Sequence, residues 1–186
     1  TDPAALLESA LIDALSRECL LGEDAKTLFS TDVYGEGIAP ALVVRPQSQE
    51  QVADAVRIAA TAGWAVTQRG GGMSYTGGYL PTQPNTMMLD LSGLNRIVSI
   101  NEDDLVITVE AGVTWQQIWE ALTPRGLRLP FFGTFSGSRA TVGGGLSNGA
   151  LFIYGHGALR QCRRYCGRHA SDRRARSTYP DRPGGL

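Results

Sequence analysis

Residues 69–78 read Arg-Gly-Gly-Gly-Met-Ser-Tyr-Thr-Gly-Gly and directly follow the run Trp-Ala-Val-Thr at 64–67. Because glycine has no Cβ, this backbone can adopt positive φ and approach a ligand closely. Successive N–H groups can then converge on an anion. Arg69 adds a positive charge, and Ser74 and Thr76 add hydroxyl donors. The stretch therefore predicts a strand that opens into a phosphate-binding loop, with a flexible glycine linker as the alternative.

The loop matches neither of the common nucleotide-binding fingerprints. No lysine follows the glycines, as G-x-x-x-x-G-K-[ST] requires, and Tyr75 stands where G-x-G-x-x-G requires its third glycine. The glycine loop alone therefore predicts a phosphate but no particular nucleotide.

The residues before the loop predict a β-α-β unit. A short strand at 41–44 is closed by Pro46. Ser48 and Gln51 have the spacing of a capping box, so a helix begins there and runs to about residue 62, with Gly63 at its C-cap. The apolar face of this helix holds Val52, Ala55, Val56 and Ala59. Such a unit places the loop at the carboxyl end of a strand, where α/β proteins bind ligands.

Further elements flank this unit. Apolar residues at helical spacing predict an amphipathic helix over 4–20, followed by turn-rich residues at 31–40. Strands are predicted at 87–91, 97–100 and 105–109, with a hairpin turn at 101–104. A second capping box, from Thr114 to Gln117, opens a helix through residue 122. Helices on parallel strands followed by hairpins predict an α+β fold.

A second glycine cluster follows the hairpin. It reads Gly-Thr-Phe-Ser-Gly-Ser at 133–138 and Ala-Thr-Val-Gly-Gly-Gly-Leu-Ser-Asn-Gly at 140–149. Small residues and hydroxyls again replace bulky side chains. Taken separately, each cluster could be a tight turn. Together, and with a β-α-β unit before the first, they favour a long ligand with a diphosphate, such as a dinucleotide.

Four motifs in this order resemble a known family. They are 44–46 leading through the helix to the loop 69–74; Leu-Asp-Leu-Ser-Gly-Leu-Asn-Arg-Ile at 89–97; Val-Glu-Ala-Gly-Val-Thr-Trp at 109–115; and 141–148. Over about residues 35–157 the chain resembles the PCMH-type FAD-binding domain of the vanillyl-alcohol oxidase / p-cresol methylhydroxylase flavoprotein superfamily. The resemblance implies an FAD-binding type 2 domain, in which two α+β subdomains hold FAD between them and a substrate domain follows. The second subdomain is expected to be incomplete in this truncated chain.

The resemblance assigns FAD binding to both glycine clusters. The backbone of 69–78 would hold the diphosphate, and the second cluster would border the diphosphate and the flavin. The implied reaction is hydride transfer from an alcohol, amine or 2-hydroxy acid to the flavin, which carries the chemistry. The residues implied in cofactor binding are Arg69, Gly70, Gly71, Gly72, Met73, Ser74, Thr76, Gly77, Gly78, Gly133, Ser136, Gly137, Thr141, Gly143, Gly144, Ser147 and Asn148.

Met73 is a departure from the family pattern. Many relatives have a histidine there, and in some of them it binds the flavin covalently. A thioether cannot form that linkage, so we expect non-covalent FAD. No catalytic residue can be named, because the only histidines, His156 and His169, lie outside the matched catalytic motifs.

Two hypotheses about function follow from these residues. In the first, the chain is the FAD-binding part of a flavin-dependent oxidoreductase that meets a small-molecule substrate through a missing domain and is inactive alone. In the second, it is a non-catalytic, truncated FAD-binding remnant. The oligomeric state is left open.

Composition limits the other classes of function. No run approaches the about 18 apolar residues of a membrane span, and the first residues lack the features of a signal peptide. Three cysteines make no disulfide framework. We therefore expect a cytoplasmic protein without a membrane partner, a nucleic-acid partner or a metal.

The sequence predicts three segments: a helix and lead-in at 1–34, the FAD-binding domain at 35–157 and a tail at 158–186. The tail holds eight arginines and no lysine. That composition is typical of a GC-rich gene read out of frame, so we hypothesise a frameshift near residue 160 and a disordered tail. The alternatives are a zinc site of Cys162, Cys166 and His169 and an arginine arm that binds nucleic acid. We favour a solvated tail. The zinc site has no fourth ligand nearby except His156, and neither an apolar face nor interleaved aromatic residues accompany the arginines.

Overall fold

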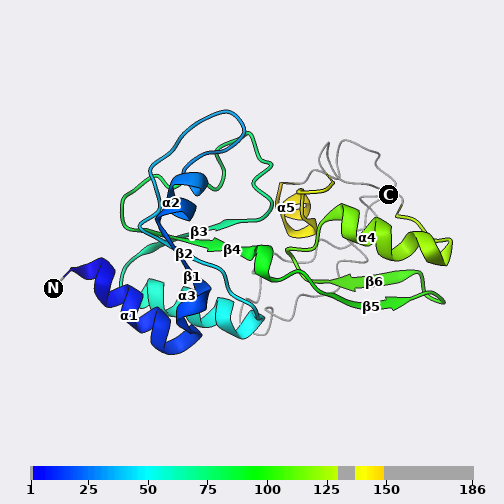
Figure 1. Cartoon of the computed structure of the whole chain (residues 1–186), viewed down its shortest axis with the longest axis horizontal. Coiled ribbons are helices and arrows are strands. Elements are labelled where there is room, and N and C mark those ends of the chain that lie inside the picture. Colours follow the sequence, from blue (N-terminus) through cyan, green and yellow to red (C-terminus); the bar gives the residue numbers. More distant parts are fainter. Residues whose placement is uncertain (1, 130–136, 149–186) are drawn as a thin grey trace, which may run out of the picture.

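The computed structural model describes residues 2–129 and 137–148. A four-stranded sheet with α1–α3 lies beside a two-stranded sheet with α4 and α5 (Figure 1). This arrangement confirms the predicted α+β fold. The bounds are α1 Pro3–Leu15, β1 Leu20–Leu21, α2 Glu23–Phe29, β2 Leu42–Val44, α3 Gln49–Thr61, β3 Ala65–Arg69, β4 Thr86–Asp90, β5 Ile97–Asn101, β6 Val106–Val109, α4 Trp115–Leu122 and α5 Val142–Ser147, with 3₁₀ turns at Arg17–Cys19, Leu91–Gly93 and Thr123–Arg125.

The first sheet has the strand order β1-β2-β4-β3. The strands β2, β4 and β3 are parallel, and β1 pairs antiparallel with β2 at the edge. Thus β4 lies between the two strands of the predicted β-α-β unit, with Met88 opposite both Val43 and Thr67. The glycine loop begins the connection 70–85, which returns the chain from the carboxyl end of β3 to the amino end of β4.

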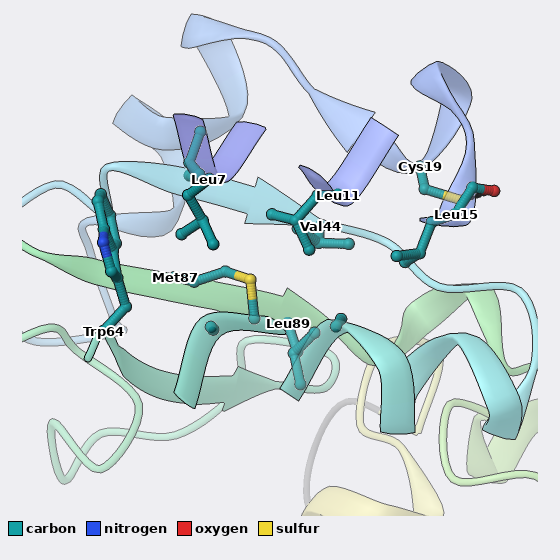
Figure 2. Packing of buried hydrophobic residues seen from close by; sticks show 11 residues of the cluster. Leu7, Leu11, Leu15, Cys19, Val44, Trp64, Met87 and Leu89 are labelled. Carbon is teal, nitrogen blue, oxygen red and sulfur yellow. Dashed lines mark hydrogen bonds between the residues drawn. The ribbon is translucent and has the colours of Figure 1, made fainter. Parts of the chain in front are cut away.

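Side chains of the central strands alternate between two cores, as the period of a strand requires. On one face, Leu7, Leu11 and Leu15 of α1 point toward Val44, Met87 and Leu89 (Figure 2). Buried alanines of α3 complete this core. On the other face, Val43 and Met88 pack with Phe29 and Tyr79. Both faces of the central strands β2 and β4 are therefore covered, which explains their apolar sequence.

The predicted helix over 4–20 is too long. α1 ends at Leu15, and Ser16 has a φ of 120°. A 3₁₀ turn follows, and then Leu20 and Leu21 pair with Val44 and Val43 as β1. The apolar spacing continues past residue 15, but pairing with the sheet edge satisfies the backbone of these leucines and overrides the helical pattern.

The predicted apolar face of α3 is partly wrong. Ala55 and Ala59 are fully buried, but Val56 is 38% exposed. Val52 packs against the core as predicted, and Ile58 packs there in place of Val56. The small alanines let α3 approach the sheet closely, so the buried stripe is rotated away from Val56.

One predicted capping box forms completely and the other forms in half. Thr114 and Gln117 bond reciprocally at the start of α4. At α3, Ser48 Oγ accepts from the Gln51 N–H at 3.3 Å. The Gln51 Oε1 accepts instead from the Gln47 N–H at 2.7 Å, one residue before the predicted partner. Gly63 has a φ of 74° at the predicted C-cap.

The second sheet is the predicted antiparallel hairpin of β5 and β6, with a register shift between Ile97 and Ser99. Its turn is held by Asn101, whose Oδ1 accepts from the Asp104 N–H at 3.0 Å. The return strand begins one residue later than predicted because Leu105 has a φ of 54°. The hairpin and α4 share a core with Ala140 that includes Val113, Trp115, Ile118 and Leu122.

The predicted boundary at 34/35 stays a prediction, although α1 packs into the same core as β2 and β4. The tail 158–186 and the frameshift hypothesis lie outside the described residues. No helix of the described part of the chain has the length and apolarity needed to cross a membrane.

Candidate cofactor-binding site

A cavity of about 530 Å³ lies where the carboxyl ends of β2, β3 and β4 face α4 and the residues before α5. Most of its lining residues have polar side chains, and they come from segments far apart in the sequence. The lining residues are Leu28, Phe29, Arg45, Arg69, Gly70, Gly71, Asp90, Ser92, Asn95, Gly112, Thr114, Gln116, Gln117, Glu120, Ser138, Arg139 and Thr141.

Arg69 is a buried cation in this wall. It ends β3 and is only 8% exposed. Its guanidinium carbon lies 4.2 Å from the centroid of the Phe29 ring and 5.5 Å from that of Tyr79. Among the described residues its Nε has no hydrogen-bond partner, and no carboxylate forms an ion pair with it. A buried cation of this kind is suited to an anionic ligand.

The aromatic rings around Arg69 hold the guanidinium in place by cation–π contact. Burial raises the pKa of the Tyr79 hydroxyl, and the neighbouring charge of Arg69 opposes that rise. Tyr79 is therefore neutral at physiological pH and adds no negative charge that would compensate Arg69.

The two glycine clusters meet at this cavity. A Cβ at Gly70 would lie 2.5 Å from Thr141 Oγ1, and a Cβ at Gly71 would lie 1.7 Å from the carbonyl oxygen of Arg139. Glycine is therefore required here by close backbone packing as well as by any ligand. Of the residues predicted for cofactor binding, Arg69, Gly70, Gly71 and Thr141 line one cavity.

The second half of the glycine loop turns away from the cavity. Met73 packs against the core that the β5–β6 hairpin shares with α4. The hydroxyls of Ser74 and Thr76 bond to each other at 3.0 Å, and the Gly77 N–H donates to Asp32 at 2.8 Å. Neither these residues nor Gly72 and Gly78 line the cavity. Their predicted role in cofactor binding stays a prediction.

The second cluster uses several of its donors within the chain. Thr141 Oγ1 accepts from the Gly144 N–H at 3.3 Å as the N-cap of α5, and the Gly143 N–H donates to the Ala111 carbonyl at 2.9 Å. The Asn148 amide donates to the carbonyl of Gly144 at 3.2 Å. The remaining predicted residues of this cluster are Gly137, whose carbonyl accepts from the Gln116 N–H at 3.0 Å; Ser147, the last residue of α5; and Gly133 and Ser136, which lie outside the described residues.

Sequence reasoning missed several residues of the cavity wall. Arg45 Nε and Nη2 each lie 2.7 Å from Asp90 Oδ2, and Asp90 is only 1% exposed. Asp90 also accepts from the Ser92 N–H at 3.1 Å. The signal for this pair was a charged residue at the carboxyl end of each of two apolar strands. Arg139 carried no such signal, because it lies between the two halves of the second cluster.

Comparison with known proteins defines the family. A family model described as an FAD binding domain matches residues 40–164, which is more than half of the 186 residues. The chain belongs to this FAD-binding family. This family model confirms the predicted resemblance to an FAD-binding domain. p-Cresol methylhydroxylase with bound substrate shares the fold, with a TM-score of 0.60 and 23% identity over 67% of this chain and 25% of that one.

Other relatives carry different activities in their names. The mitochondrial D-lactate dehydrogenase (cytochrome) of Kluyveromyces lactis is 32% identical over 145 residues, which is 76% of this chain and 25% of that protein. Reticuline oxidase of Eschscholzia californica is 30% identical over 112 residues, which is 60% of this chain and 20% of that protein. This chain thus spans about a quarter of the length of the lactate dehydrogenase it matches.

Solved structures agree on the fold. Alkyldihydroxyacetonephosphate synthase superposes with a TM-score of 0.67 at 20% identity, over 76% of this chain and 31% of that one. The 4-ethylphenol oxidase of Gulosibacter chungangensis has a TM-score of 0.58 at 28% identity, over 67% of this chain and 25% of that one. These likenesses confirm the FAD-binding fold in a chain that covers part of each neighbour.

Proposed function

We propose that this chain binds FAD non-covalently and forms the FAD-binding part of a flavin-dependent oxidoreductase. The observation that carries the proposal is Arg69, a buried guanidinium beside Gly70 and Gly71 whose Nε has no partner within residues 2–129 and 137–148. The diphosphate of FAD offers negative charge and acceptor oxygens, so the residues present fit this group. Family membership supports FAD over other phosphate-bearing ligands.

The residues of the chain have separate tasks in this proposal. Arg69 would hold the diphosphate through its positive charge, and the ring of Phe29 keeps the guanidinium in position. Gly70 and Gly71 allow the backbone to come close to the phosphates. Arg139 lies in the same wall and adds positive charge. Bound FAD would supply the hydride acceptor, while the protein binds and orients it.

Titration calorimetry with FAD tests this assignment. The wild-type chain is compared with R69Q and with the matched control R57Q, since Arg57 is exposed and pairs with Asp54 on the outer face of α3. Loss of a charge-assisted hydrogen bond predicts affinity about tenfold weaker or more for R69Q. R57Q should bind within about twofold of wild type. No binding by the folded wild-type chain, or equal affinities of R69Q and wild type, would contradict the proposal.

The non-covalent attachment has its own test. Met73 offers a thioether that packs against apolar side chains, which supports a flavin that is held without a bond. Denaturing the flavin-loaded chain in acid and filtering it should leave all of the flavin in the filtrate. Flavin retained by the denatured polypeptide would overturn this part of the proposal.

We further propose a small-molecule substrate bound by a part of the protein outside the FAD-binding domain. Among alcohols, amines and 2-hydroxy acids, a 2-hydroxy acid has the best support as the substrate. Two relatives, from Kluyveromyces lactis and Saccharomyces cerevisiae, are named D-lactate dehydrogenase and match 76% of this chain. Neither nucleic acid nor a membrane is part of the proposal. The cytoplasm is the proposed compartment, supported by the buried free thiol of Cys19, and fractionation of cells would test it.

A further inference from the structure

Asp32 lies in the turn before β2, and its carboxylate accepts a hydrogen bond from the glycine loop. Asp32 Oδ1 accepts from the N–H groups of Tyr34 and Gly35, both at 2.8 Å. Asp32 Oδ2 accepts from the Gly77 N–H, also at 2.8 Å. Backbone N–H groups that converge on one anion form a nest, and here the anion belongs to the protein. The Gly77 N–H is therefore occupied by an aspartate that lies 45 residues away in sequence.

Other contacts join the same two segments. The Val33 N–H donates to the Ser74 carbonyl at 3.2 Å. The rings of Tyr34 and Tyr75 meet edge to face, with 6.1 Å between their centroids. Since both rings are largely exposed, this contact adds little burial. Asp32 thus provides the charge-assisted bond between two segments that otherwise share neutral contacts, and such bonds are the stronger kind.

Tyr79 links the glycine loop to Arg69. The Tyr79 hydroxyl lies 3.1 Å from the Thr31 carbonyl and 3.4 Å from the Gly72 carbonyl, so it joins the turn to the start of the loop. Gly72 has a φ of 68°, and a Cβ there would lie 1.9 Å from Arg69 Nη2. The backbone at residue 72 therefore closes directly over the guanidinium. A shift of the loop at residue 72 would therefore change the packing around the Arg69 guanidinium.

We propose that Asp32 is a positioning residue, which holds residues 72–79 in the conformation that presents Arg69 to a phosphate-bearing ligand. The identity of that ligand as FAD rests on the proposed function. The hydrogen bonds from the N–H groups of Tyr34, Gly35 and Gly77 lower the pKa of Asp32. The carboxylate is therefore ionised at neutral pH, as the three N–H donors require.

Two variants separate the bond to Gly77 from the local turn. D32N keeps an acceptor for Tyr34 and Gly35 but turns an NH₂ donor toward the Gly77 N–H. D32S keeps one acceptor for the turn and removes the second oxygen. D104N is the matched control, because Asp104 also lies in a turn with a side-chain hydrogen bond, at the tip of the β5–β6 hairpin. Circular dichroism confirms that each variant is folded.

The readouts are the amide resonance of Gly77 in glycine-selectively ¹⁵N-labelled full chain and the affinity for FAD. In wild type we expect the Gly77 proton downfield, because its N–H donates to a carboxylate. D32N and D32S should shift it upfield and weaken FAD binding about tenfold. D104N should change neither. A role of Asp32 confined to its own turn would move Gly35 and leave Gly77 in place.

The outcomes distinguish this inference from the proposed function. If D32N moves the Gly77 resonance but FAD binds as tightly as to wild type, the positioning role is wrong. If Gly77 does not respond in either variant, the contact itself is wrong. If the wild-type chain binds no FAD at all, the proposed function fails, while the response of Gly77 still decides whether Asp32 holds the loop.

Discussion

Arg69 and Asp32 both contact the glycine loop, but they differ in whether the protein already provides them with hydrogen-bond partners. Arg69 is buried, and its Nε has no partner among the described residues, whereas Asp32 has three N–H donors and is bound by the loop itself. The first is therefore suited to a ligand and the second to holding the loop. The sequence does not show this difference, because residues 70–72 and 77–78 are all glycine. Only the three-dimensional structure shows which of the N–H groups already have an acceptor.

The substitution G71A tests the close contact between the two glycine clusters. The added Cβ would meet the carbonyl oxygen of Arg139 at 1.7 Å, a backbone atom that cannot move aside alone. Overpacking predicts a loss of about 1–3 kcal/mol in the free energy of unfolding, together with weaker FAD binding. Urea denaturation measures the loss. The control G22A, where a Cβ meets nothing within 4 Å, should lose less than about 1 kcal/mol; equal losses would contradict the assigned contact.

At the level of elements, alternation and capping predicted most of the fold. The buried run of β4 and the capping box at Thr114 had clear local signals, so both could be found from the sequence. The short strand β1 could not, because Leu20 and Leu21 continue a helical pattern and only their pairing with β2 decides their conformation. The antiparallel hairpin was predicted correctly, but its irregular register depends on contacts that no local pattern encodes.

The ion pair that anchors the start of β5 predicts a pH dependence of stability. Glu110 is nearly buried and accepts from Arg96 through its backbone N–H, Nε and Nη2. The hydrogen bonds from the Arg96 side chain lower the pKa of Glu110. A lowered pKa stabilises the fold above the pKa of the unfolded glutamate, and this contribution is lost as the pH falls through the folded value.

The substitution E110Q should therefore reduce the free energy of unfolding by about 1.5–3 kcal/mol at pH 7. Because protonated Glu110 resembles glutamine, the difference from wild type should shrink as the pH falls below the ordinary range of glutamate. Urea denaturation at several pH values measures it. E102Q, which removes an exposed partner of Arg125, should cost less than about 1 kcal/mol. A pH-independent effect of E110Q would refute the mechanism.

For the whole molecule, the sequence indicated which segments contribute to the site but not how they are combined. Both glycine clusters were found from their composition, and the structure brings Gly71 and Thr141 to one cavity. Arg45 and Asp90 were missed by the sequence analysis as residues of the cavity wall. They come together only because the parallel strands β2 and β4 end side by side. The role of Met73 in cofactor binding stays a prediction, and its side chain packs against the core of the hairpin and α4.

The arrangement of the cavity predicts that the chain alone does not turn over a substrate. Among the described residues the cavity wall holds two carboxylates, Asp90, which is paired with Arg45, and Glu120, which accepts from the amide of Gln116 at 2.7 Å, and the proposed substrate-binding part lies outside this wall. With FAD bound and oxygen excluded, D-lactate should leave the flavin absorbance unchanged, while dithionite bleaches it. Bleaching by D-lactate would show catalytic competence and contradict this prediction.

The central claim is that FAD lies against the start of the glycine loop. It is tested most directly by adding FAD to the glycine-selectively ¹⁵N-labelled chain and following the amide resonances. We predict that Gly70 and Gly71 shift, while Gly22 and Gly126, which lie away from the cavity wall, stay in place. A folded chain in which FAD leaves Gly70 and Gly71 unmoved, or moves only the remote glycines, would contradict the account.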